Sequence, residues 1–194
     1  AMYRAMALYF LRRGIDGADE AAVAAACGDV EISLDYKDGI QQIFLNGENV
    51  TGQIRAEEVG RMASLTSAYG PVRKKLVELQ RALAGRRDVV MDGRDIGTAV
   101  LPDATLKVYL TASSRVRAER RFKELEEKGV SCSLEEIEKD IIDRDYRDMH
   151  RELSPLCQAE DAILLDSSDM TLEEVVRELE ELVEDAGTRG CCGC

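Results

Sequence analysis

Three short apolar runs, separated from one another by helical sequence, set the strongest limit on the fold. They span residues 88–91, 106–110 and 162–165, and the first and last are followed directly by Asp92 and Asp166. Continuous apolar runs of this length are typical of buried parallel strands. Strands that alternate with helices predict an α/β fold with a doubly wound parallel sheet, and ligands of such folds bind beyond the carboxyl ends of the strands.

A different pattern occupies residues 29–52. Apolar and polar side chains alternate over 30–36, and Asp38-Gly39 and Asn46-Gly47 are hairpin turn signals on either side of the run 40–45. The pattern predicts a small antiparallel meander. Helices are expected over 1–13, 19–26, 54–67, 71–84, 114–128, 133–151 and from 171 to just before Gly187, with capping boxes at Ser133/Glu136 and Thr171/Glu174.

Charge and composition limit the partners. The 194 residues carry a formal net charge of −12, which argues against a general nucleic-acid or membrane-surface binder. No run reaches the ~18 apolar residues of a membrane span, and there is no signal peptide. The scattered cysteines fit reduced cytosolic thiols, and with His150 as the single histidine they predict no metal site. For the cysteine-rich tail we expect a disordered or artefactual segment.

The strongest chemical signal lies in the helix predicted over 133–151. Arg144, Arg147, Asp148 and Arg151 follow at i, i+3, i+4 and i+7, so they share one helical face. This stretch uses arginine and no lysine, and a planar guanidinium matches phosphate oxygens two at a time. The pattern indicates a phosphate site. The alternative interpretation is a solvated face whose acids and arginines pair with one another.

Further arginines stand at the ends of other elements. Asp92-Gly93-Arg94-Asp95 follows the first predicted strand, at the place where α/β proteins bind ligands, although a tight turn with a surface ion pair would look similar. Arg4, Arg73, Arg120 and Arg121 add to this set. Together they predict a positively charged cleft in an acidic protein, as a dianionic substrate and a polyphosphate require.

The order of these segments resembles the bacterial-type cytidylate kinases, a family of nucleoside monophosphate kinases. The resemblance covers residues 1–183 and rests on Tyr3-Arg4, Ser64, Pro71-Val72-Arg73, Asp92-Gly93-Arg94-Asp95-Ile96-Gly97-Thr98, Pro102-Asp103-Ala104 and Arg144-Asp145-x-Arg147-Asp148-x-x-Arg151. The meander at 29–52 is similar to the insert that distinguishes this family from adenylate kinases. The resemblance implies that the protein transfers the γ-phosphate of ATP to CMP and dCMP, and that Mg²⁺ is carried by the nucleotide. It also implies a cytoplasmic protein that is a monomer.

Residue roles follow from the same resemblance. It implies that Arg4, Arg94 and Arg151 hold the CMP phosphate, that Ser64, Arg73 and Asp95 read the cytosine, and that Arg144 and Asp148 contact the ribose and the phosphate side. Arg94, Arg144 and Arg151 are the implied catalytic residues, and Arg120 and Arg121 belong to the implied ATP-side lid. A carboxylate at Asp95 can accept a hydrogen bond from the exocyclic amine of cytosine, whereas uracil presents a carbonyl there.

The implied domains are an incomplete core α/β domain and three smaller parts. The core comprises 1–28, 53–114 and 152–186, with the insert at 29–52, the helical lid at 115–151 and a tail at 187–194. In the family, a strand, a phosphate loop, its helix and a second strand precede the position of Ala1. No Gly-x-x-x-x-Gly-Lys-[Ser/Thr] occurs in the 194 residues. We therefore expect a truncated form with a gap in its sheet, exposed strand faces and low stability by itself.

Three alternatives to this function stay open from the sequence. One is a non-catalytic protein that still binds CMP through its arginines. Another is a kinase that prefers UMP or AMP, which the role of Asp95 separates from a cytidylate kinase. The last is a structural, acidic helical protein whose arginines only pair with neighbouring acids.

Overall fold

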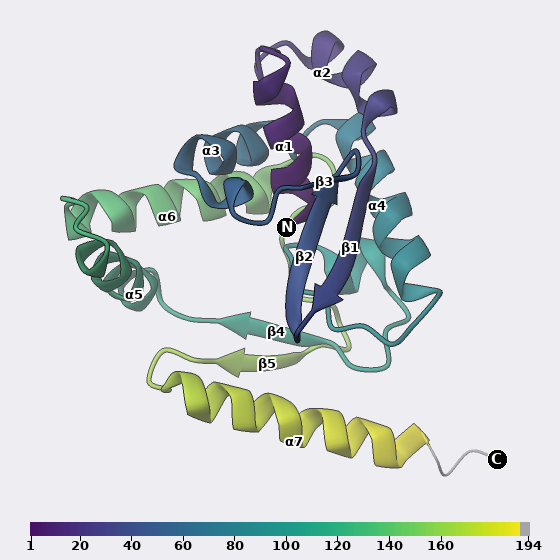
Figure 1. Ribbon diagram of the computed structural model, residues 1–194. Helices are drawn as coiled ribbons and strands as arrows, with labels where there is room; N and C mark the ends of the chain where they lie inside the picture. Colours follow the sequence, from purple (N-terminus) through teal and green to yellow (C-terminus); the bar gives the residue numbers. More distant parts are fainter. Residues whose placement is uncertain (191–194) are drawn as a thin grey trace. The chain divides into compact units, whose positions relative to one another are not determined.

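The computed structural model describes residues 1–190, and the chain forms two compact units, Ala1–Val90 and Met91–Cys194 (Figure 1). We refer to them as the N-terminal and C-terminal units. The first contains a three-stranded antiparallel sheet and the second a parallel pair of strands, so the predicted α/β class is confirmed at this level. No helix within residues 1–190 is long and apolar enough to cross a membrane.

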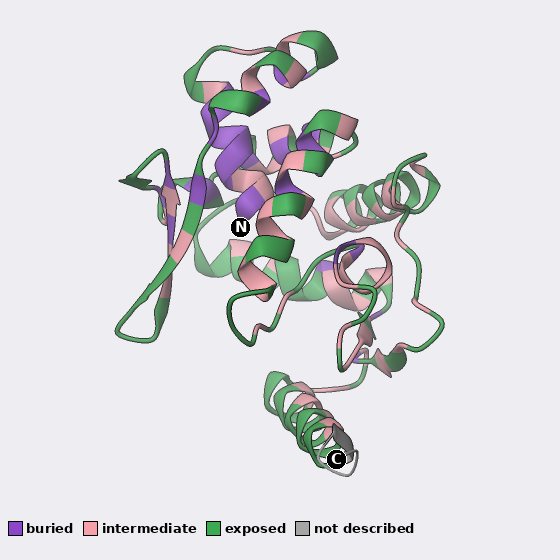
Figure 2. Ribbon diagram, turned by 90° about the vertical axis from the view of Figure 1, so that its right-hand side faces the viewer, coloured by how far each residue is buried: buried purple, intermediate pink, exposed green. Residues whose placement is uncertain are grey.

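Helix α1 (Met2–Arg12) is the centre of the N-terminal unit, where the buried residues gather (Figure 2). Ala5, Met6 and Phe10 are completely buried, as expected for a helix that is apolar on most sides. The helix packs against α3 and β2. The other elements of the unit are α2 (Glu20–Ala26), β1 (Ile32–Lys37), β2 (Ile40–Leu45), β3 (Glu48–Asn49), α3 (Glu57–Thr66), α4 (Gly70–Ala84) and 3-10 turns at Cys27–Asp29 and Gln53–Arg55.

The predicted meander is confirmed. Strands β1 and β2 pair antiparallel from Ile32↔Leu45 to Lys37↔Ile40, and β3 continues the sheet beside β2. The two turns fall at the predicted positions, and Asp38, Gly39, Asn46 and Gly47 all adopt positive φ angles between 47° and 82°. Two consecutive residues with positive φ are what a two-residue hairpin turn needs, which explains why Asp-Gly and Asn-Gly predict it.

The C-terminal unit is built on two parallel strands. Its elements are a π-helical turn (Ile96–Val100), β4 (Val108–Thr111), α5 (Ser114–Glu127), α6 (Leu134–His150), β5 (Ile163–Asp166) and α7 (Leu172–Gly190). Strands β4 and β5 pair from Val108↔Ile163 to Thr111↔Asp166, and α5 packs against α6 in the connection between them. This confirms two of the three predicted parallel strands.

The predicted strand at 88–91 is wrong. The segment has no regular structure, and Val90 is 99% exposed. A strand persists only where its backbone groups are paired with a neighbour, and within residues 1–190 each of β4 and β5 pairs only with the other. The expectation of exposed strand faces is confirmed, because Leu110 and Leu164 are 52% and 58% exposed.

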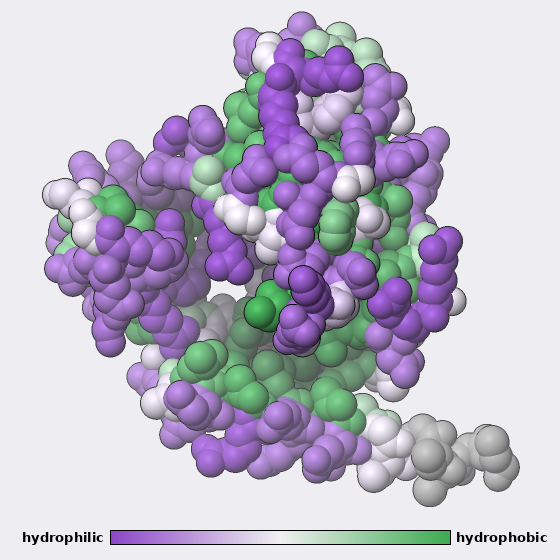
Figure 3. Space-filling model, viewed as in Figure 1, coloured by the Kyte–Doolittle hydropathy of each residue, from purple (hydrophilic) through white to green (hydrophobic). Residues whose placement is uncertain are grey.

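Helix α7 is longer than predicted and largely uncovered. It continues through Gly187 to Gly190, because a glycine ends a helix readily only where it adopts positive φ, and Gly187 is not among the glycines that do. Its apolar stripe includes the exposed Leu172, Val176 and Val183, and Figure 3 shows apolar atoms along this helix. Cys191, Cys192 and Cys194, for which we expect a disordered tail, lie outside the described residues.

The start of α7 is held by the predicted capping box. The Thr171 amide donates to Glu174 Oε2 at 2.8 Å, and the Glu174 amide donates to Thr171 Oγ1 at 3.2 Å. Hydrogen bonding of the Glu174 carboxylate to the Thr171 backbone amide, and then to the Thr171 hydroxyl, lowers the pKa of Glu174 from its ordinary value of 4.5. The contribution of the ionised Glu174 carboxylate to stability is therefore fully present above the ordinary pKa of 4.5. It is lost as the pH falls through the lower pKa of the folded state.

Replacing Thr171 by alanine is expected to loosen the first turns of α7. Loss of a threonine N-cap typically costs about 1 kcal/mol, and α7 has little packing to compensate for it. Hydrogen exchange of the amides at 172–176 should become faster at pH 7, and the pKa of Glu174, followed by NMR, should rise towards its ordinary value. Unchanged exchange rates in this segment would show that the cap does not stabilise the helix.

Candidate functional site

Four charged residues of the C-terminal unit gather around Asp148, in the last turn of α6. Asp148 Oδ2 lies 3.1 Å from Arg94 Nε and 3.9 Å from Arg144 Nε, and Asp148 Oδ1 lies 3.7 Å from Arg151 Nη1. Arg151 Nη2 lies 4.0 Å from Asp95 Oδ1. We call Arg94, Asp95, Arg144, Asp148 and Arg151 the Asp148 cluster. The structure thus brings five of the sequence-predicted site residues together.

The end of α6 determines how the helical members are presented. Arg144 and Asp148 lie one turn apart on the same face. The helix ends at His150, and Arg151 adopts an extended backbone with φ −67° and ψ 145°. Its side chain bends back, and Nε donates to the Ser154 carbonyl at 2.8 Å. Arg147 behaves differently from the prediction, because its exposed side chain donates at 3.2 Å to the Asp143 carbonyl of its own helix.

The other two members come from the segment before β4. Asp95 precedes the π-helical turn, and its carbonyl accepts from the amides of Ala99 and Val100 at 2.9 and 3.2 Å. A Cβ at Gly93 would lie 2.7 Å from Ile96 Cγ1, so a larger residue there would force this turn to shift. The π-helical turn has no signal in the sequence, because five residues show no periodicity that separates it from an ordinary loop.

The charges of the cluster favour recognition of an anion. Three guanidiniums face two carboxylates, and the side chains of Asp95 and Asp148 are only 7% and 13% exposed. Charge interactions are stronger at such sheltered positions than in bulk water. Arg94 and Arg144 are 42% and 50% exposed, so a ligand can reach them from solvent. The arrangement can bind a phosphate through the arginines and a hydroxyl or amine through the carboxylates.

Three further predicted residues lie in the N-terminal unit. Arg4 donates through Nη1 to the carbonyls of Ile54 and Ala56 at 3.0 and 3.4 Å. Arg73 is 5% exposed and donates to the Ser67 carbonyl at 3.2 Å. Ser64 lies in α3, and its carbonyl accepts from the Ser67 hydroxyl at 2.9 Å. Ser64 and Arg73 therefore contact the same turn between α3 and α4, and their predicted roles stay predictions.

Gly60 makes room for Arg4, and it offers a test of how firmly Arg4 is held. A Cβ at this position would lie 3.0 Å from Arg4 Nη2. Glycine in a helix is destabilising by about 0.5–1 kcal/mol relative to alanine. Because the crowding atom is the end of a flexible side chain, we expect Gly60→Ala to raise the thermal midpoint by a few degrees, roughly 2–4 °C for each kcal/mol. A lowered midpoint would mean that Arg4 cannot move.

The two arginines predicted for the ATP-side lid differ in their surroundings. Arg120 donates to the Ser167 carbonyl at 2.5 Å and to the Met170 carbonyl at 3.1 Å, so it is anchored to the turn between β5 and α7. Arg121 pairs with Glu124 at 2.7 Å and is 47% exposed. Lys128 and then Arg121 lower the pKa of Glu124 to about 2. The exposed Arg121 is therefore the one of the two that a polyphosphate can reach without breaking backbone contacts.

An ion pair beside the cluster involves a residue that no sequence motif singles out. Arg117 of α5 lies with Nη2 at 2.6 Å from Asp145 Oδ2. Asp145 follows Arg144 directly in the sequence, but its partner is 28 residues away on another helix. No local spacing predicts a contact of this kind.

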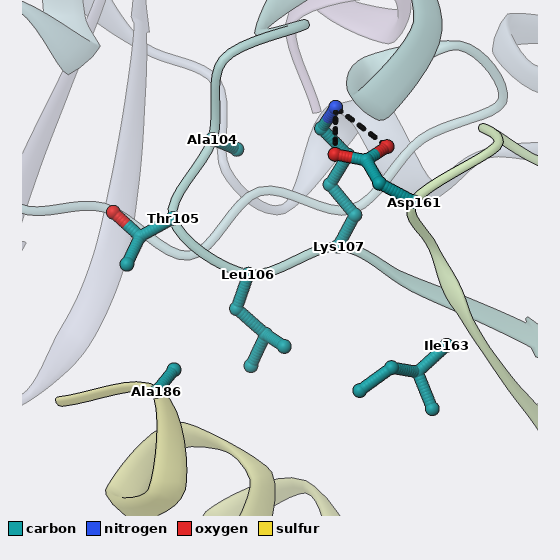
Figure 4. A pocket seen from close by; sticks show the side chains of 7 residues that line it. All are labelled: Ala104, Thr105, Leu106, Lys107, Asp161, Ile163 and Ala186. Atoms are coloured by element: carbon teal, nitrogen blue, oxygen red, sulfur yellow. Dashed lines mark hydrogen bonds and ion pairs between the residues drawn. The ribbon is translucent and has the colours of Figure 1, made fainter. Parts of the chain in front are cut away.

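A cavity of about 360 Å³ lies elsewhere in the same unit, between the start of β4, β5 and the end of α7 (Figure 4). Leu106 points towards Ala186, whereas Lys107 points away to Asp161 and donates to both of its carboxylate oxygens at 2.8 Å. The single cation at this cavity is therefore already neutralised, and most of the other side chains are apolar. We do not assign a binding site there.

Comparison with known proteins gives consistent results over nearly the whole chain. A family model described as cytidylate kinase matches residues 1–185. The chain is 46% identical over 184 residues to the cytidylate kinase of Lactobacillus johnsonii, covering 95% of this chain and 80% of the relative. It is 48% identical over 185 residues to the cytidylate kinase of Desulfitobacterium hafniense, covering 95% of this chain and 79% of the relative. It is 42% identical over 190 residues to the cytidylate kinase of Geobacter sp., covering 98% of this chain and 82% of the relative.

These matches define a kinase, a nucleotide-binding transferase. Within that class, the chain belongs to the cytidylate kinase family. The resemblance on which the sequence-based function rested is thereby confirmed.

Proposed function

We propose that the Asp148 cluster binds the nucleoside monophosphate acceptor, CMP or dCMP, of a reaction that transfers the γ-phosphate of ATP. The observation that carries the proposal is Asp148 itself, a carboxylate only 13% exposed that has three arginines within 4.0 Å. Such a group holds the guanidiniums in one place before a ligand arrives, which reduces the cost of ordering them on binding.

Each member of the cluster has a chemical task in this proposal. Arg94 and Arg151 donate to the phosphate of CMP, and Arg144 supplies charge on the same side. Asp148 accepts from a hydroxyl of the sugar, and Asp95 accepts from the amine of cytosine. The attacking atom is a phosphate oxygen that is already ionised near neutral pH, so the protein needs no strong base. The arginines orient this oxygen and neutralise charge around the transferring group.

The donor side of the reaction is supported less directly by these residues. The 194 residues contain no Gly-x-x-x-x-Gly-Lys-[Ser/Thr] sequence that would cradle the phosphates of ATP. Within residues 1–190 no group of three or more His, Cys, Asp or Glu side chains is placed to hold a metal ion. We propose that Mg²⁺ is carried by the phosphates of ATP.

The remaining assignments are proposals that rest on the family. They are the P-loop type of doubly wound sheet, a helical lid over 115–151, a cytoplasmic location and a monomeric state. The implied roles of Arg4, Ser64 and Arg73 belong with them.

Calorimetric titration of the 194-residue chain with CMP, dCMP, UMP and AMP tests the proposed function. We expect CMP and dCMP to bind at least about tenfold more tightly than UMP, a difference of ~1.4 kcal/mol. Equal affinity for all four nucleotides would contradict the assignment of Asp95. Binding of CMP without formation of ADP when ATP and Mg²⁺ are added would favour a CMP-binding protein over an enzyme for this chain.

A further inference from the structure

We propose that Arg117 and Asp145 form a positioning pair that holds α6 in the place where its charged residues meet Arg94 and Asp95. The pair touches neither the proposed phosphate nor the proposed base contacts, and it acts through the helix. This inference rests on the proposed use of the Asp148 cluster as the nucleotide site.

Polar contacts have a large share in the position of helix α6, because its apolar side chains are at most half-buried where it packs against α5. None of its 17 residues is buried, and Ala118 is the single buried residue of its neighbour α5. An ordinary surface helix is held by an apolar stripe packed on a core. In α6 the stripe formed by Leu134, Ile137 and Ile141 is only half-buried, so ion pairs between the helices have a larger share in fixing their relative position.

Arg117 connects three parts of the unit. Its Nη2 lies 2.6 Å from Asp145 Oδ2 of α6, and its Nε donates at 3.0 Å to the carbonyl of Ala112, just after β4. The side chains of Arg117 and Asp145 are 36% and 18% exposed, so the pair is partly sheltered from solvent. The guanidinium therefore fixes α6 relative to the end of β4. Asp145 is followed three residues later by Asp148, the centre of the cluster.

A second ion pair between the same helices provides the comparison. Arg115 Nη1 lies 3.1 Å from Glu138 Oε2, but Arg115 is 49% exposed and its Nε also contacts Glu119 at 3.1 Å. Glu138 lies seven residues before Asp145, which is about 10 Å along the helix. Exposed, shared pairs of this kind contribute little. Glu138 therefore also joins α6 to α5, but its pair is more exposed and lies farther from the cluster than that of Asp145.

Loss of the Asp145 charge should act on nucleotide binding through geometry. With asparagine at this position, the Arg117 side chain keeps its bond to Ala112 but no longer attracts α6 by charge. The end of α6 is then free to shift relative to Arg94 and Asp95. Displacements on the order of 1 Å are enough to weaken interactions that depend on well-placed donors.

The test compares Asp145→Asn with Glu138→Gln in the 194-residue chain. CMP affinity is measured by calorimetry, and hydrogen exchange is followed for the amides at 144–150 and, as an internal reference, for those of α1. We expect Asp145→Asn to weaken CMP binding about tenfold and to speed exchange at 144–150 while α1 is unchanged. Glu138→Gln should change the affinity by less than about threefold, and Asp145→Glu, which keeps the charge, should restore most of it.

Two results would overturn the inference. One is equal loss of affinity in Asp145→Asn and Glu138→Gln. The other is an Asp145→Asn chain whose exchange at 144–150 and CMP affinity match those of the unchanged chain. If the unchanged chain does not bind CMP, the proposed function fails, and the exchange rates still decide whether the pair positions α6.

Discussion

Replacing Asp95 by asparagine is expected to abolish most of the preference for cytosine over uracil. A carboxylate only accepts hydrogen bonds, so it pairs with the exocyclic amine of cytosine and faces the corresponding carbonyl of uracil without a donor. Asparagine offers an NH₂ group as well as an oxygen, so it can pair with either base. We expect the ratio of CMP to UMP affinity to fall at least about tenfold, because sites built around such a hydrogen bond discriminate strongly.

The fold around Asp95 should survive this change. The bonds that start the π-helical turn go to the backbone carbonyl of Asp95, from the amides of Ala99 and Val100 at 2.9 and 3.2 Å, and the substitution leaves this carbonyl in place. Asparagine has nearly the same shape as aspartate and fits the same sheltered position, in which the side chain is 7% exposed. A change in selectivity can therefore be separated from a loss of structure.

Calorimetric titration of the variant with CMP and UMP measures the effect. Asp92→Asn is the matched control, because Asp92 lies three residues earlier and is exposed. That variant should keep the selectivity of the unchanged chain. If Asp95→Asn kept it as well, Asp95 would not read the base, and a kinase or binding protein with another preference would become the better interpretation.

Local signals in the sequence predicted the local structure well. Asp38-Gly39 and Asn46-Gly47 predicted both hairpin turns, because these residues tolerate the positive φ angles that the turns require. Thr171 and Glu174 predicted the start of α7 through a capping box whose two bonds are both present. In each case the signal and the structure involve the same few neighbouring residues, so no distant partner can change the outcome.

Predictions that depend on distant partners succeeded less often. The apolar run at 88–91 looks like a strand, yet no strand within residues 1–190 pairs with it. In the site, helical spacing placed Arg144 and Asp148 together, but it also placed Arg147 there, and Arg147 bonds its own helix instead. The pairs from Arg94 to Asp148 and from Arg117 to Asp145 join segments that are far apart in sequence. Only the folded chain defines them.

Replacing Arg151 by lysine is expected to weaken CMP binding by about 1.5–3 kcal/mol, the usual range for a hydrogen bond to a charged group, or roughly 10- to 150-fold. The guanidinium of Arg151 is 10% exposed, lies within 4.0 Å of both Asp95 and Asp148, and is oriented by the Ser154 carbonyl. A lysine keeps the charge but has one nitrogen in place of three. It cannot keep the bond to Ser154, balance the carboxylates and bind two phosphate oxygens at once.

Arg147→Lys is the matched control for this prediction. It makes the same chemical change four residues earlier on α6, where the exposed arginine donates to the Asp143 carbonyl. We expect it to change CMP affinity less than about twofold, since the charge is kept and the contact that is lost is an exposed one within α6. Calorimetry gives both affinities, and urea unfolding shows whether either variant has lost stability. Equal affinities for Arg151→Lys and Arg147→Lys would mean that the arginines of α6 act only through their summed charge, and the geometric role of the Asp148 cluster would have to be abandoned.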